Sequence, residues 1–230
     1  MPRKAGLAIF VSAFVVGLSG ALMPGPLLTL DITEAARQGF WAGPTLVLGH
    51  AVAELLAVAL LVKGLGRFIR RWYVIGGIGV VGGGFLLWMG GAIFTTTWTS
   101  PLSGIGADLS PASPFWVLAG SGALVSVTNP YWLLWWATIG TGYVVMSLRQ
   151  GIAGVGSFYA GHILSDLLWY SVVAFIIASG RNFLTDSVYQ VVLLVCGVAL
   201  VGLGAYFVFS GVRFLWRRKA VVAGESEEER

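Results

Sequence analysis

The segment that decides the fold is residues 5–30, AGLAIFVSAFVVGLSGALMPGPLLTL. Its first 19 residues, Ala5 to Met23, nearly match the roughly 20 apolar residues that an α-helix needs to span a membrane. Arg3 and Lys4 precede the run as in a signal peptide, but it is longer than the roughly 7 to 15 apolar residues typical of one. We therefore expect a retained first span, interrupted at Pro24-Gly25-Pro26.

The composition of the whole chain agrees with this class. Of the 230 residues, 57% are hydrophobic and only 10% are charged, whereas soluble domains carry about 25% charged residues. Apolar runs occupy residues 5–30, 43–62, 73–94, 114–147, 151–178 and 188–212. The sequence predicts an all-α polytopic membrane protein with six transmembrane helices. Because no length remains for a soluble catalytic domain, we do not expect an enzyme.

Residue counts and motifs exclude several site classes. One cysteine and two histidines cannot build a disulfide framework or a four-ligand Cys/His zinc site. The sequence also lacks a P-loop, and residues 77–82 match the dinucleotide pattern GxGxxG without a preceding strand. Gly79 and Gly83 are better explained as a close helix contact. We therefore expect no cofactor.

The basic residues predict the orientation of the chain. With the N-terminus in the cytoplasm, twelve Lys and Arg residues lie inside, and only Arg37 and Arg181 lie outside. Both termini are then cytoplasmic. The net charge of +4 reflects this topology rather than a nucleic-acid partner.

The two halves of the chain resemble each other. Residues 49–56 (GHAVAELL) match residues 161–168 (GHILSDLL), residues 91–94 match 204–207, and Met23-Pro24 matches Asn129-Pro130. Since each half has three spans, the halves must enter the membrane from opposite sides, which predicts a 3+3 inverted repeat. We assign residues 1–94 to the first repeat, 95–113 to a connecting loop, 114–212 to the second repeat and 213–230 to a cytoplasmic tail. The alternative is a chance likeness between glycine-rich helices.

Helices one and four are predicted to be broken. Proline removes a backbone donor, so each helix must stop and restart at Pro24-Gly25-Pro26 and at Asn129-Pro130. A restart inside the membrane leaves amides at the positive end of a helix dipole, where a substrate carboxylate can bind. The alternative is a pair of proline kinks satisfied by neighbouring helices. The predicted substrate-binding residues are Pro24, Gly25, Pro26, Leu27, Asn129, Pro130, Tyr131 and Trp132.

Two pairs of ionisable residues lie at mid-span. His50 precedes Glu54 by four residues and His162 precedes Asp166 by four, so each pair shares a helix face. Because a charge facing lipid is costly, both pairs should face the bundle interior. We expect the carboxylates to bind an amine or carry protons, with the histidines as relays. The alternative is a purely structural tie between helices.

The sequence allows more than one role for several other side chains. Asp31 is grouped with the proton-coupling or amine-binding residues and is expected near the outer mouth, where Glu34 is expected to be solvated. Tyr131, Trp132, Trp135 and Trp136 offer an aromatic wall for a cationic substrate, although aromatic residues are also common at membrane interfaces and in helix packing.

These motifs resemble those of the lysine exporter (LysE/RhtB-type) translocator family. The resemblance rests on Pro24-Gly25-Pro26, residues 39–43 (GFWAG), Gly49, Asn129-Pro130 and six spans in 230 residues. It implies an inner-membrane exporter of amino acids or related metabolites, driven by the proton-motive force and without a prosthetic group.

Three hypotheses follow for the function. The first is a secondary exporter, a proton antiporter whose two broken helices bind a carboxylate while Glu54 and Asp166 bind the amine or proton. The second is a divalent metal cation exporter that uses His50, Glu54, His162 and Asp166. The third is a membrane scaffold that transports nothing. Expected partners are an amino acid, protons, the lipid bilayer and, through the glycine-rich faces of spans three and six, a second copy of the chain.

Overall fold

The computed structural model describes the chain except residues 1–2, 65–67, 69–70, 100–111, 181–185 and 229–230. The described residues form helices joined by short turns, with no strand among them. Five helices are long and apolar enough to cross a membrane, and a sixth apolar helix is shorter. The five are α1 (Arg3–Ala21), α3 (Ala42–Val62), α5 (Trp72–Thr99), α9 (Gly151–Gly180) and α10 (Asp186–Glu228), and the shorter helix is α6 (Phe115–Thr128). The all-α multi-pass prediction is confirmed.

Both predicted helix interruptions are present. The first apolar run forms α1 and then α2 (Pro26–Gln38), which begins at Pro26 after the non-helical Gly25. The fourth run forms α6 and then, after the non-helical Asn129, α7 (Pro130–Trp135). Proline is favoured at the first helical position because it lacks an N–H and has a fixed φ.

The fourth run contains a further irregularity that the sequence did not predict. A π-helix, η1 (Trp136–Gly140), links α7 to α8 (Thr141–Leu148). The hydroxyl of Thr141 donates to the backbone carbonyl of Trp136 at 2.7 Å. Such wide turns are rare and often occur at functional sites.

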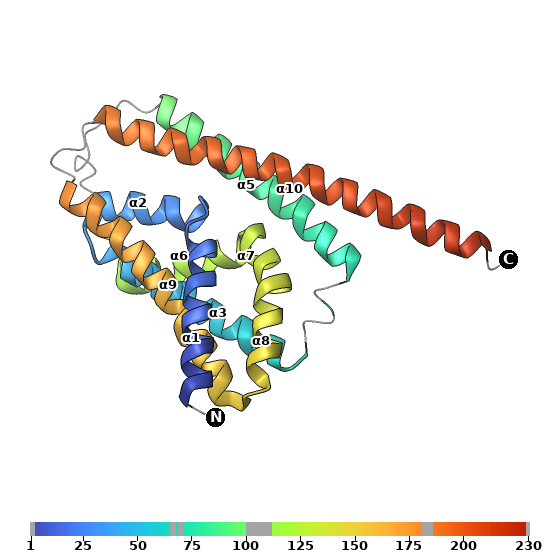
Figure 1. Cartoon of the computed structure of the whole chain (residues 1–230). Helices are drawn as coiled ribbons and strands as arrows, with labels where there is room; N and C mark the ends of the chain where they lie inside the picture. Colours follow the sequence, from blue (N-terminus) through green and yellow to red (C-terminus); the bar gives the residue numbers. More distant parts are fainter. Residues whose placement is uncertain (1–2, 65–67, 69–70, 100–111, 181–185, 229–230) are drawn as a thin grey trace.

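The helices form two groups (Figure 1). Helices α5 and α10 lie side by side as a long pair, while α1, α3, α6, α7, α8 and α9 gather beside them, with α1 along α9 and α3 along α6. Helix α10 continues to Glu228, beyond the apolar run predicted to end at residue 212, and α5 continues to Thr99, beyond residue 94. The predicted connecting loop, 95–113, falls mainly on residues 100–111, outside the described part.

Glycines allow these helices to approach closely. A Cβ added to Gly49 would lie 1.7 Å from the carbonyl oxygen of Ala119, and one added to Gly161 would lie 2.3 Å from that of Phe10. In the α5–α10 pair, an added Cβ at Gly83 would lie 2.8 Å from the carbonyl oxygen of Gly204. Small residues at helix interfaces are typical of membrane proteins. The close helix contact expected at this glycine is confirmed.

Candidate substrate-binding site

A cavity of about 620 Å³, including its opening to the surroundings, lies between the two interruptions. Eleven of the thirteen predicted site residues line it: Pro24, Gly25, Pro26, Leu27, His50, Glu54, Asn129, Tyr131, Trp132, His162 and Asp166. The interruptions themselves are adjacent, since a Cβ added to Gly25 would lie 3.4 Å from Nδ2 of Asn129. The structure therefore brings segments more than 100 residues apart in the sequence into one site.

The N-terminus of α2 opens on this cavity. No side chain of the described residues caps it, and Pro26 has no N–H to offer. The first backbone amide bonded within the turn is that of Thr29, which donates to the carbonyl of Gly25 at 3.0 Å. The amides of Leu27 and Leu28 precede it and have no intrahelical acceptor. This helix end has the features of an anion site.

The N-terminus of α7 differs from the prediction. Oδ1 of Asn129 accepts a hydrogen bond from the amide of Tyr131 at 3.0 Å. The expectation that this amide is free for a substrate is therefore wrong, because the N-cap side chain already satisfies it. Pro130, a further predicted site residue, is fully buried and does not line the cavity.

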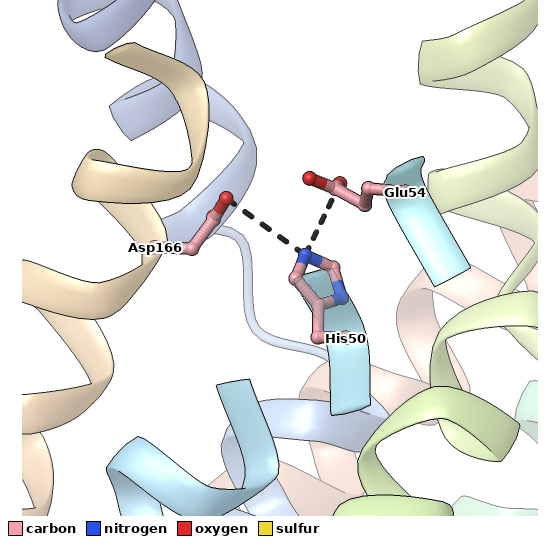
Figure 2. Close-up of side chains that lie close together, drawn as sticks. All are labelled: His50, Glu54 and Asp166. Atoms are coloured by element: carbon pink, nitrogen blue, oxygen red, sulfur yellow. Dashed lines mark ion pairs between the residues drawn. The ribbon is translucent and has the colours of Figure 1, made fainter. Parts of the chain in front are cut away.

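Four ionisable residues meet at the base of the cavity, and we call them the histidine–carboxylate cluster: His50 and Glu54 on α3, and His162 and Asp166 on α9. Nε2 of His50 lies 3.1 Å from Oε1 of Glu54 and 3.8 Å from Oδ2 of Asp166 (Figure 2). Nε2 of His162 lies 3.2 and 3.8 Å from the same two oxygens. Glu54 is 1% exposed and Asp166 is 3% exposed. Both carboxylates thus face the bundle interior, as expected.

The two carboxylates of the cluster have different surroundings. Oε1 of Glu54 accepts hydrogen bonds from the indole N–H groups of Trp132 at 3.1 Å and Trp136 at 3.2 Å. Trp136 occupies the first position of the π-helix. Oδ2 of Asp166 has no hydrogen-bond partner among the described residues. Oε1 of Glu54 is therefore held in place, whereas Oε2 of Glu54 and Oδ2 of Asp166 remain as acceptors for a ligand.

The hydrogen-bond network indicates which ring nitrogen of His50 carries a proton. Ser126 donates its hydroxyl proton to the carbonyl of Gly122 at 2.6 Å. Its oxygen must then accept from Nδ1–H of His50, which lies 2.6 Å away. In neutral His50 the other nitrogen, Nε2, can only accept a hydrogen bond, yet it lies beside two carboxylates that also only accept. A proton held on Nε2 or on one of the carboxylates supplies the missing donor.

Comparisons with known proteins agree with this geometry. The family model described as LysE type translocator matches residues 18–211. The chain belongs to this family. It is 25% identical over 213 residues to the putative amino acid efflux protein YcgF of Bacillus subtilis, covering 90% of this chain and 98% of the relative. It is 26% identical over 212 residues to the chemotactic transduction protein ChpE of Pseudomonas aeruginosa, covering 86% and 96%. No solved structure matches the chain.

Aromatic side chains form part of the wall of this LysE type translocator's cavity. Three of the four predicted residues, Tyr131, Trp132 and Trp135, line it, whereas Trp136 is buried behind them. The ring of Trp135 stacks on that of His162 with centroids 4.5 Å apart. Trp135 was noted in the aromatic wall but not among the predicted site residues.

The cavity also has lining residues that the sequence did not indicate. They are Gly20, Ala21, Met23, Leu86, Ser126, Tyr170 and Leu203. Two of them, Leu86 on α5 and Leu203 on α10, bring the long helix pair to the cavity. Apart from Met23, which precedes the Pro24-Gly25-Pro26 motif, no local motif marks these positions, because they are defined only by how the helices pack.

Asp31 lies elsewhere. It does not line the cavity and is fully buried, and neither carboxylate oxygen has a hydrogen-bond partner among the described residues. It packs where α2 meets α3, since a Cβ added to Gly43 would lie 2.8 Å from its Oδ1. Glu34, expected to be solvated, forms an ion pair with Arg37 at 2.8 Å.

Proposed function

We propose that this LysE type translocator exports an amino acid across the inner membrane in exchange for protons. The observation that carries the proposal is a single cavity that joins an uncapped helix N-terminus to a buried cluster of carboxylates and histidines. An amino acid is a zwitterion, and these two ends are complementary to its two charges. A relative named as a putative amino acid efflux protein supports the same substrate class.

Each end of the substrate has a place in the cavity. The carboxylate binds the amides of Leu27 and Leu28 at the start of α2, where the helix dipole favours negative charge. The ammonium group binds Asp166, whose Oδ2 has no hydrogen-bond partner among the described residues. Glu54 adds negative charge beside it while its own position is fixed by two indole donors.

Proton coupling follows from competition for the same acceptors. Without substrate, the cluster needs a proton between His50 and the carboxylates, as the hydrogen bond from His50 to Ser126 implies. An ammonium group brings its own donors and its own positive charge to these oxygens. Because the proton and the ammonium group need the same acceptor, Oδ2 of Asp166, binding of the substrate releases the proton. Alternate occupation of one cluster by substrate and proton is antiport.

The proposed inverted repeat provides the conformational change that transport needs. Its assignment, residues 1–94 against 114–212, is supported by the packing of α1 on α9 and of α6 on α3, which the repeat exchanges. Gly49 and Gly161 are equivalent in the repeat, and each lies under a backbone carbonyl of a neighbouring helix. Rocking of the two halves about the cavity would open it first to the cytoplasm, which contains both termini, and then to the outside.

The cavity favours a neutral, apolar amino acid side chain. Met23, Leu27, Leu86 and Leu203 line it beside the aromatic residues. Its acidic residues are the two in the histidine–carboxylate cluster, and these bind the α-amine. A second cationic group, as in lysine, would have no carboxylate of its own and would be costly to bury.

Transport by the purified protein tests the proposal. The protein is reconstituted in liposomes, a pH gradient is imposed, and the movement of radiolabelled leucine is compared with that of lysine. We expect gradient-driven leucine flux that falls about 10- to 100-fold in Asp166→Asn, since a charge-assisted contact is worth about 1.5 to 3 kcal/mol. The matched control is Glu34→Gln, an acid outside the cavity, which should transport normally. Undiminished flux from Asp166→Asn and Glu54→Gln would refute the assigned roles.

A further inference from the structure

We propose that three residues of the histidine–carboxylate cluster, His50, Glu54 and Asp166, also form a site for Zn²⁺ or a similar transition-metal ion, and that the bound ion blocks export. Each residue offers one nitrogen or oxygen atom, and these three atoms all lie within 4.8 Å of one another. One imidazole and two carboxylates form a nitrogen–oxygen set that suits such ions. The blocking role depends on the proposed function, whereas the binding site does not.

The spacing of these atoms is close to that of a zinc site. Zinc bonds to nitrogen and oxygen are about 2.0 to 2.1 Å long, so neighbouring ligand atoms in a tetrahedral site lie about 3.3 to 3.4 Å apart. Nε2 of His50 lies 3.1 Å from Oε1 of Glu54 and 3.8 Å from Oδ2 of Asp166. Shifts of about 0.5 Å or less would bring these two pairs to ideal spacing.

The surroundings of the cluster favour a metal over a simple ion pair. Ser126 accepts the Nδ1 proton of His50 and so directs the Nε2 lone pair toward the cluster, as an outer hydrogen bond does for metal-binding histidines. Oδ2 of Asp166 and Oε2 of Glu54 are buried and have no hydrogen-bond partner among the described residues. A bound cation would give each of these oxygens the partner that a buried acceptor needs.

The position of this site makes the ion an inhibitor. The ion would occupy the oxygens that receive the substrate ammonium group, so the two cannot bind together. Its release would require breaking three bonds to protein ligands, in a site of which Glu54 and Asp166 are almost fully buried. Mg²⁺ and Ca²⁺ prefer six or more oxygen ligands and should not compete.

Binding to the purified full-length protein tests the site. The protein carries an affinity tag without histidines, and Zn²⁺, Co²⁺ and Mg²⁺ are titrated in a calorimeter. We expect one Zn²⁺ per chain, no response to Mg²⁺, and the visible absorption of tetrahedral Co²⁺. His50→Ala should abolish the Co²⁺ spectrum, and Ser126→Ala should weaken binding about 10- to 100-fold through the lost outer hydrogen bond. The matched control, Glu34→Gln, should bind as the wild type does.

Failure of this site would be distinct from failure of the proposed function. Absence of Zn²⁺ binding, an octahedral Co²⁺ spectrum, or binding unchanged in the folded Ser126→Ala protein would overturn the metal site, whatever the transport result. Leucine flux is then measured with Zn²⁺ present, alongside a zinc-sensitive dye inside the liposomes. We expect leucine flux to stop and the dye to stay dark. Unaffected leucine flux, or Zn²⁺ carried to the dye, would overturn the blocking role.

Discussion

Capping the N-terminus of α2 should make the protein more stable and a poorer transporter. Gly25 is the N-cap residue, its backbone is extended, and no side chain of the described residues caps this helix. In Gly25→Asn, the new side chain can accept from the amide of Leu27 or Leu28. Asn129 shows the same arrangement at α7, where it bonds the amide of Tyr131 at 3.0 Å. The variant would thus fill the proposed carboxylate site from within the chain.

The Gly25→Asn substitution should have opposite effects on stability and on substrate binding. A side-chain cap contributes about 0.5 to 2 kcal/mol relative to alanine, although the gain over glycine is only a few tenths. The substrate carboxylate would lose a hydrogen bond to a charged group, worth about 1.5 to 3 kcal/mol, which corresponds to a rise in KM of about 10- to 100-fold. Space allows the change, because a Cβ at this position lies 3.4 Å from Nδ2 of Asn129, an ordinary contact.

The matched control for this variant is Gly25→Ala, which adds the same Cβ without an acceptor. Thermal unfolding in detergent, followed by tryptophan fluorescence, gives the stability, and leucine flux at several concentrations gives KM. We expect Gly25→Asn to unfold at a higher temperature than Gly25→Ala and to have the higher KM of the two. Equal KM values for the two variants would refute the carboxylate site at α2.

Three further substitutions probe the packing and the charges. Gly122→Ala places a Cβ 2.1 Å from a backbone oxygen of α3, so it should cost about 1 to 3 kcal/mol of stability. The adjacent Gly120→Ala, with nothing within 4 Å, should unfold as the wild type does, and equal melting of the two would contradict the close contact. Trp136→Phe removes one hydrogen-bond donor from Glu54. It should lower pH-driven leucine flux at least about tenfold, because a hydrogen bond to a charged group is worth about 1.5 to 3 kcal/mol. Unchanged flux would show that this hydrogen bond is dispensable. Asp31→Asn should not lower the unfolding temperature, since it removes a buried acid without partners among the described residues, and a clear drop would reveal a partner.

Much of the fold could be predicted because the deciding signals are local. An apolar run of about 20 residues predicts a membrane helix wherever its neighbours lie. A proline interrupts a helix through its own missing N–H, so the breaks at Pro24-Gly25-Pro26 and Asn129-Pro130 needed no tertiary information. The spacing of His50 and Glu54 likewise places them on one helix face.

The rest of the site depends on contacts between distant helices. The repeat indicated that His50 and His162 are equivalent, but their shared contact with Glu54 exists only because α3 packs beside α9. The bond between His50 and Ser126 joins residues 76 positions apart, and no local motif marks Ser126. Asn129 shows a different limit. The sequence predicted that a helix restarts there, but not that the Asn129 side chain accepts from the Tyr131 amide and so removes this amide as a substrate donor.

The differences between the two halves explain how a nearly symmetric site could bind its substrate in one orientation. Asn129 caps the helix that follows it, whereas Gly25 at the other interruption does not cap α2, so only one of these two helix ends is left without a side-chain cap. The acids differ as well, because indole donors hold Oε1 of Glu54 while Oδ2 of Asp166 has no hydrogen-bond partner among the described residues. With equivalent helix ends and equivalent acids, a zwitterion would have two mirror-related poses of equal energy. In the proposed function, one helix end without a side-chain cap and one acid without indole donors favour a single pose, in which the proton and the ammonium group compete for Asp166.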